Sequence, residues 1–113
     1  MSAAVAELER VLDELEALGQ TEAELISRRD LEKLPGITAR RADLAGRVAE
    51  LMATTVLEDD QRSACERRVE RIVREASDHL ALLCSARDEL GEEIRSLVDA
   101  RRALDRYAAV RRS

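Results

Sequence analysis

The sequence predicts an all-α fold: an elongated antiparallel helical bundle or coiled coil of about three helices, with one long C-terminal helix. Alanine, leucine, glutamate and arginine dominate the chain, whereas its 113 residues include four glycines and one proline, a profile typical of long helices. Apolar residues recur every three or four positions, which is the period of a helical stripe. Aromatic residues make up 1% of the chain, so a thick globular core is not expected.

The first helix is expected over residues 3 to 28. Its apolar positions form one stripe, and aspartates and glutamates fill the opposite face. Gly19 lies inside this pattern, at a point where the helix can bend. The stripe consists of Leu8, Val11, Leu12, Leu15, Leu18, Leu25 and Ile26.

The second helix is expected over residues 31 to 55, with Asp30 as its N-cap. Pro35 and Gly36 fall in its opening turns and leave two interpretations open. Either a kinked helix begins at 31, or a short turn precedes a helix that begins at about 36. The apolar stripe consists of Leu34, Ile37, Leu44, Val48 and Leu51.

The third helix is expected over residues 60 to 110, with Asp59 or Asp60 as its N-cap and Gly91 as the one weak point. All of residues 1 to 113 then form one helical domain. The apolar seam of this helix is close to a heptad repeat, with an extra residue between Ala76 and Leu80. It consists of Val69, Ile72, Ala76, Leu80, Leu83, Leu90, Ile94, Leu97, Leu104 and Ala108.

Two shorter helices cover only part of such a long helix, so the end of the seam is expected to be exposed. Exposed apolar stripes usually bind a protein, here either a second copy of the chain or a foreign helix. Tyr107, the single aromatic residue, has two open roles: an anchor for a partner or a residue that packs at the end of the seam. The predicted partner-binding residues are Leu90, Ile94, Leu97, Leu104 and Tyr107.

No pattern in the sequence supports an enzyme. His79 is the only histidine, and a lone histidine on a helix is more often a surface or seam residue than a catalytic base or a metal ligand. The paired acids at 59 and 60 and at 92 and 93 are adjacent in sequence and therefore point in different directions on a helix. The glycines form no phosphate-binding motif. No catalytic, cofactor or metal site is predicted.

Charge and hydropathy argue against nucleic acids and membranes as partners. The net charge is −5, and no aromatic platform accompanies the C-terminal arginines. No stretch approaches the ~18 apolar residues of a membrane span, and the acidic start of the chain is unlike a secretion signal. Cys65 and Cys84 have neither the spacing of a metal site nor that of a disulfide framework. The chain is therefore expected to be cytoplasmic.

The segment "VERIVREASDHLALLCSARDELGEEIRSLVDARRALDRYAA" resembles the C-terminal half of the FlgN-type flagellar export chaperones. Leu82, Leu83 and Ala86 match the leucine pair and alanine of that family, and Tyr107 matches its terminal tyrosine. The first half, from "LERVLDELEALG" to "LAGRVAEL", is similar to the family's opening helix, turn and second helix. The resemblance covers nearly the whole chain.

This resemblance implies a small cytoplasmic chaperone of the flagellar type III export system. Such a chaperone binds the C-terminal amphipathic helices of hook-filament junction proteins, prevents their premature assembly and delivers them to the export gate, for which Tyr107 is the candidate contact. The alternative is a structural or adaptor protein without a client, which forms a homodimeric coiled coil through the same seam.

Overall fold

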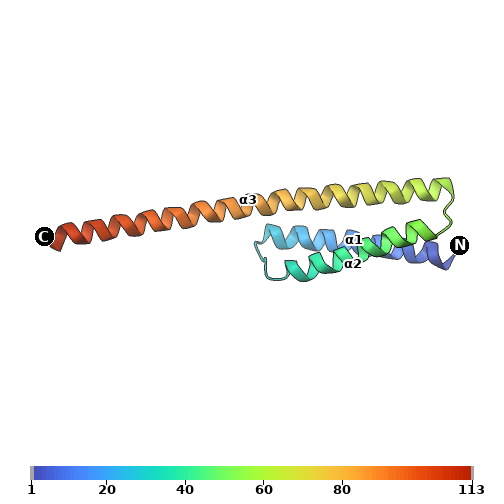
Figure 1. Cartoon of the computed structure of the whole chain (residues 1–113), viewed down its shortest axis with the longest axis horizontal. Coiled ribbons are helices and arrows are strands. Elements are labelled where there is room, and N and C mark those ends of the chain that lie inside the picture. The colour runs from blue at the N-terminus through green and yellow to red at the C-terminus, as the bar shows by residue number, and fades with distance from the viewer. Residues whose placement is uncertain (1, 113) are drawn as a thin grey trace. The chain divides into compact units, whose positions relative to one another are not determined.

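The computed structural model describes residues 2–112, which form three α-helices and no strand: α1 (Ala3–Ser27), α2 (Leu34–Thr54) and α3 (Asp59–Arg112), as Figure 1 shows. The predicted all-α class and the long C-terminal helix of 54 residues are confirmed. The chain divides into two compact units, one that ends at Leu80 and one that begins at Ala81. The boundary falls within α3.

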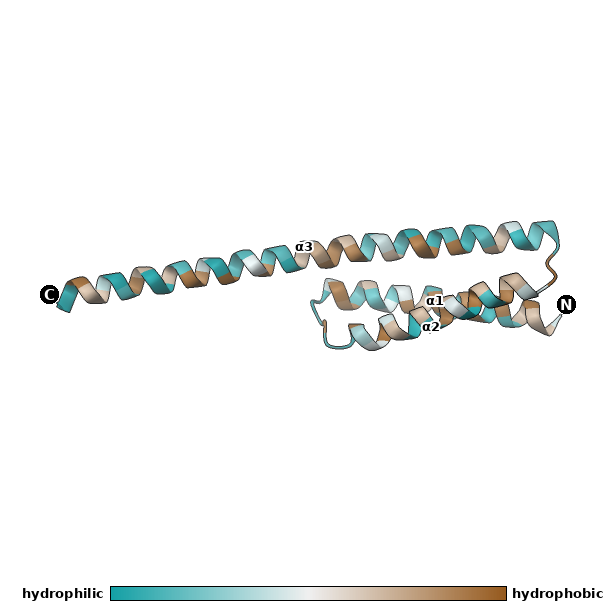
Figure 2. Ribbon diagram, in the orientation of Figure 1, coloured by the Kyte–Doolittle hydropathy of each residue, from teal (hydrophilic) through white to brown (hydrophobic). Residues whose placement is uncertain are grey.

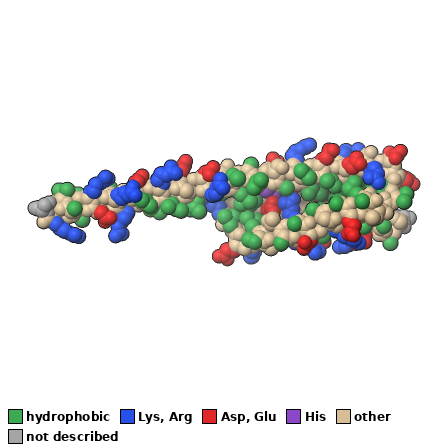
Figure 3. All heavy atoms as spheres, viewed as in Figure 1, with side chains coloured by type: hydrophobic (Ala, Val, Ile, Leu, Met, Phe, Trp, Pro, Cys, Tyr) green, Lys and Arg blue, Asp and Glu red, His purple; other side chains and the backbone are tan. Residues whose placement is uncertain are grey.

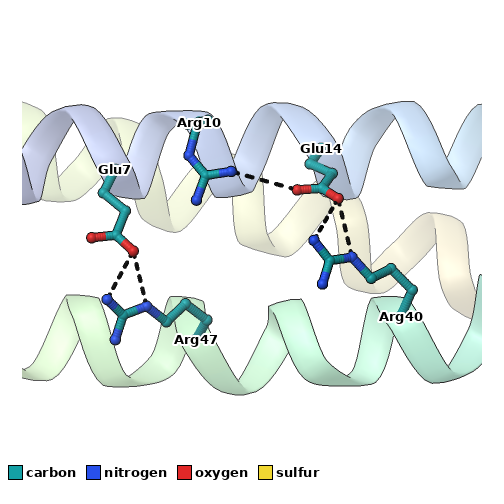
Figure 4. Close-up of polar contacts among 5 residues, drawn as sticks. All are labelled: Glu7, Arg10, Glu14, Arg40 and Arg47. Carbon is teal, nitrogen blue, oxygen red and sulfur yellow. Dashed lines mark hydrogen bonds and ion pairs between the residues drawn. The ribbon is translucent and has the colours of Figure 1, made fainter.

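In the first unit, α1 and α2 form an antiparallel hairpin. Two arginines of α2 reach across to carboxylates of α1 (Figure 4): Arg47 to Glu7 at 2.8 Å and Arg40 to Glu14 at 2.9 Å. The residue numbers rise on one helix as they fall on the other, which fixes the direction of α2. The bonds to Glu7 also raise the pKa of Arg47. Both pairs are partly exposed, so water screens them and they contribute little to stability.

The core of this unit lies mainly between α1 and α2. The stripe of α1 supplies its centre, where Leu8 and Leu12 are fully buried. Val69 and Ile72 of α3 are only partly buried against it. The apolar core is therefore thin, as the scarcity of aromatic residues predicts. Its buried members are Leu8, Val11, Leu12, Leu15, Leu44, Val48, Leu51 and Cys65.

The predicted start of the second helix is wrong, because α2 begins at Leu34 and Asp30 is not its N-cap. The backbone N–H of Asp30 instead bonds back to the carbonyl of Leu25 at 2.9 Å, so this residue closes the end of α1. Arg29 lies beside it with φ 57, the left-handed conformation that often ends a helix. Pro35 stands in the first turn of α2, where a missing N–H breaks no helical bond. Neither a kinked helix from 31 nor a start at 36 is observed.

The N-cap expected at Asp59 or Asp60 is also displaced. Both aspartates lie inside the first turn of α3, where negative charge favours the helix dipole. Glu58 precedes the helix, and its N–H donates to Oε1 of Gln61 at 3.0 Å. This is one half of a capping box, with glutamate at the position usually held by serine or threonine.

The glycines do not interrupt the helices in which they lie. α1 continues through Gly19, and α3 continues through Gly91. A Cβ added at Gly19 would lie 2.5 Å from Oε1 of Glu75. Gly19 therefore makes room for a side chain of α3.

Replacing Leu12 by alanine tests the position of the core. We expect Leu12→Ala to lower the free energy of unfolding by about 2 to 5 kcal/mol, the range for a fully buried leucine. The matched control, Leu104→Ala, makes the same change at a side chain that is 66% exposed and should cost less than about 0.5 kcal/mol. Urea unfolding followed by circular dichroism measures both. Equal losses would contradict the assignment of the core.

Candidate partner-binding surface

The part of α3 that follows residue 80 carries an apolar stripe. We define the C-terminal stripe as Leu90, Ile94, Leu97 and Leu104, which are 51% to 71% exposed. Their spacings of three, four and seven place them on one helical face. Apolar turns recur along this part of α3 in Figure 2, and hydrophobic side chains gather along one of its sides in Figure 3. Regularly spaced, exposed apolar residues on one helical face are the pattern expected of a surface that binds another helix.

Tyr107 lies one turn after Leu104 and is 62% exposed. The guanidinium carbon of Arg111 lies 5.9 Å from the centre of its ring. Such a cation–π contact contributes about 0.5 to 1 kcal/mol at an exposed site. It holds the ring against its own helix while much of the ring stays open to solvent. All five predicted partner-binding residues are therefore accessible.

A buried polar cluster, which we call the triad, joins the three helices of the first unit. The carboxylate of Glu22 in α1 accepts a bond from Arg41 of α2 at 2.8 Å through its Oε1 atom. The same oxygen lies 2.7 Å from Nδ1 of His79 in α3. Glu22 and His79 are buried, and the Arg41 side chain is 11% exposed. The carboxylate of Glu22 thus links α1 to one residue of α2 and to one residue of α3.

The triad corrects the predicted seam of α3. Leu80 was expected in the seam but is 63% exposed, whereas His79 occupies that place and is buried. With His79 included, the spacing from Ile72 through Ala76 to Leu83 is a regular alternation of four, three and four. The seam therefore contains no extra residue. Of the two predicted places for His79, surface or seam, the structure shows the seam.

The triad was not predicted from the sequence, although the sequence contains a signal for it. Glu22 lies seven residues after Leu15, and Arg41 lies seven residues after Leu34, so each polar residue stands on an apolar stripe. A polar residue on each of three stripes predicts a buried polar contact, because lone buried charges are costly. Only the packing of the helices shows that the three stand at the same level.

Arg68 forms a second polar link between α1 and α3. Its Nε donates to Glu16 at 2.7 Å and its terminal nitrogen donates to Asp13 at 2.6 Å. The bond to Glu16 is the main reason why the pKa of Arg68 is raised. The Arg68 side chain is 21% exposed, so its stem also packs on the helices. α3 is thus held in this unit by polar contacts as well as by Cys65, Val69 and Ile72.

Among residues 2–112, no group of three or more histidine, cysteine, aspartate or glutamate side chains could hold a metal ion. Cys65 is buried in the core, Cys84 is exposed, and both are free thiols. Over the same residues, no helix has the length and apolar character needed to cross a membrane.

Comparisons with known proteins identify no relative of this chain. No family model, no curated protein and no solved structure matches it.

Replacing Glu22 tests the triad. We expect Glu22→Ala to lower the free energy of unfolding by about 2 to 4 kcal/mol, because Arg41 and His79 lose the carboxylate that satisfies them. The control Glu24→Ala removes an exposed carboxylate of the same helix and should change stability by less than about 0.5 kcal/mol. Thermal and urea unfolding measure both variants.

A triple replacement separates charge pairing from packing at the same place. Replacing Glu22, Arg41 and His79 together by leucine should restore stability to within about 1 kcal/mol of the natural chain or raise it, because apolar groups replace buried ion pairs well. A triple variant as unstable as Glu22→Ala would contradict this account of the triad.

Proposed function

We propose that this chain is a flagellar type III export chaperone. It binds the C-terminal amphipathic helices of hook-filament junction proteins in the cytoplasm, prevents their premature assembly and delivers them to the export gate. The observation that carries the proposal is the exposure of Leu90, Ile94, Leu97 and Leu104 on one face of α3. The resemblance of residues 69–109 to FlgN-type chaperones narrows the partner from any helix to this class.

The mechanism follows from the chemistry of an unpartnered helix face. A client helix lays its apolar face along the C-terminal stripe, as amphipathic helices do in other helix-binding proteins. A leucine that moves from water into such an interface contributes about 1.5 to 3 kcal/mol when fully buried. A client segment that is disordered alone loses entropy when it folds on the stripe, so affinity stays moderate and release remains feasible.

Binding of a client helix needs no catalysis. The described side chains fit a protein in which one part holds the helices together and another part binds the client. The triad is inside the first unit and holds helices together, whereas the apolar face lies after residue 80. Tyr107 adjoins the stripe and suits contact with the client or with the export gate, because exposed tyrosines offer a rigid apolar ring with a hydrated hydroxyl.

Calorimetric titration with a client peptide tests the proposal. The probe is the C-terminal helix peptide of a hook-filament junction protein from the same genome, with light scattering to fix the oligomeric state. We expect one peptide to bind one monomer. In the variant Leu97→Asp with Leu104→Asp, affinity should fall at least about 30-fold, because the loss of even one hot-spot residue costs about 2 kcal/mol or more.

A matched control carries two apolar-to-aspartate changes outside the stripe. Val56 and Val73 are 94% and 58% exposed, so Val56→Asp with Val73→Asp should leave affinity unchanged. Both double variants should keep their helical circular-dichroism signal. Absence of binding together with a dimer that persists on dilution would instead favour the homodimeric coiled coil.

A further inference from the structure

We propose that the helix bound by the C-terminal stripe carries two carboxylates about two heptads apart, which pair with Arg87 and Arg101. This inference rests on the proposed function and names the chemistry of the partner. It follows from where the two arginines stand on α3, from how weakly the chain itself pairs them, and from what a second copy could offer them.

The two arginines belong to the same face as the stripe. Arg87 lies seven residues before Ile94, and Arg101 lies seven residues after it. Residues seven apart on a helix share a face with a drift of only about 20°. A helix that covers the stripe from Leu90 to Leu104 therefore covers Arg101, and a helix that extends one turn beyond Leu90 covers Arg87 as well. Fourteen residues separate them, a rise of about 21 Å along the helix.

Within residues 2–112, neither arginine has a strong partner. The Nε atom of Arg101 lies 3.3 Å from Oδ1 of Asp105, and a terminal nitrogen of Arg87 lies 3.7 Å from Oδ1 of Asp88. The two arginine side chains are 80% and 78% exposed. Surface pairs of this kind contribute little, because water screens both charges. Water therefore satisfies most of the hydrogen-bonding capacity of both guanidinium groups.

A docked helix removes part of that water. The aliphatic stems of Arg87 and Arg101 pack against apolar side chains, but the guanidinium groups then need new acceptors. A carboxylate fits best, because it accepts two parallel bonds from the planar guanidinium group. A partner with leucine or lysine at these points leaves two charges unpaired or repelled, which is costly. The arginines thus select the partner, while the leucines supply affinity.

A second copy of the chain does not meet this need. In a parallel pair in register, Arg87 lies against Arg87 and Arg101 against Arg101, which is repulsive. In an antiparallel pair with Ile94 opposite Leu97, Arg87 lies opposite Leu104 and Arg101 opposite Leu90. Beside Leu104 the nearest carboxylate is Asp105, which already pairs with Arg101 of its own chain. Beside Leu90 the carboxylates are Glu89 and Glu93, which stand next to the stripe rather than on it. Charge complementarity therefore favours a foreign helix.

Designed peptides test the inference on the full-length chain. Two amphipathic helical peptides share one leucine stripe and differ at two stripe positions 14 residues apart, which hold glutamate in one peptide and glutamine in the other. Because the spacing of these two positions is the same read from either end, the peptide can pair with both arginines in a parallel or an antiparallel orientation. We expect calorimetry to give about tenfold tighter binding of the glutamate peptide, as two desolvated ion pairs allow. The preference should shrink as salt rises.

Matched variants assign the preference to particular residues. Arg87→Gln with Arg101→Gln should remove the preference for glutamate and keep binding of the glutamine peptide. Arg95→Gln with Arg102→Gln removes the same charge from positions beside the stripe and should keep the preference. Both double variants should retain the helicity of the natural chain.

The outcomes separate this inference from the proposed function. Equal affinity of the natural chain for the two peptides would overturn the carboxylate pairing but sustain helix binding. Loss of the preference in the Arg95 and Arg102 variant as well would show a general effect of net charge and would also overturn it. Binding of neither peptide would overturn the pairing and the helix-binding proposal together.

Discussion

Burial of the leucine stripe of α1 is the interaction on which the rest of the molecule depends. In the described residues, every buried apolar side chain lies between Val5 and Cys65. α1 and α2 have 25 and 21 residues, whereas α3 has 54. At about 1.5 Å per residue, two such helices cannot offer apolar contacts along the whole of α3. The apolar residues from Leu90 to Leu104 are accordingly exposed.

Polar contacts add to this thin core and specify the register in which α3 packs on the hairpin. Arg68 and the triad of Glu22, Arg41 and His79 attach α3 to the hairpin at defined levels. Leucine stripes alone tolerate sliding of one helix along another, whereas a buried carboxylate that serves two helices accepts one register. Buried polar groups act in this way in coiled coils. We infer the same role for Glu22, because a shift by one turn would leave three buried polar groups unsatisfied.

Much of the fold follows from the periodicity of apolar residues. The predictions that were wrong, at helix ends and in the seam of α3, have local physical causes. Three- and four-residue spacing predicts all three helices and the exposed positions from Leu90 to Tyr107. It does not predict the ends of helices, where Asp30 closes α1 through its backbone instead of capping α2. It also misplaces Leu80 in the seam, because hydrophobicity favours leucine over His79 when the carboxylate of Glu22 is unknown. Partners of buried polar side chains depend on tertiary packing, which a single sequence does not reveal.

Hydrogen exchange of the full chain, read by mass spectrometry with and without the junction-protein peptide, tests the central claim most directly. Exchange rates report local opening, and helices without buried contacts open easily. The account predicts slow exchange in α1 and in most of α2 in both samples. Over residues 81–112 it predicts fast exchange in the free chain and slow exchange after the peptide is added. Slow exchange over these residues in a dilute, monomeric, peptide-free sample would contradict the claim that the C-terminal stripe awaits a partner.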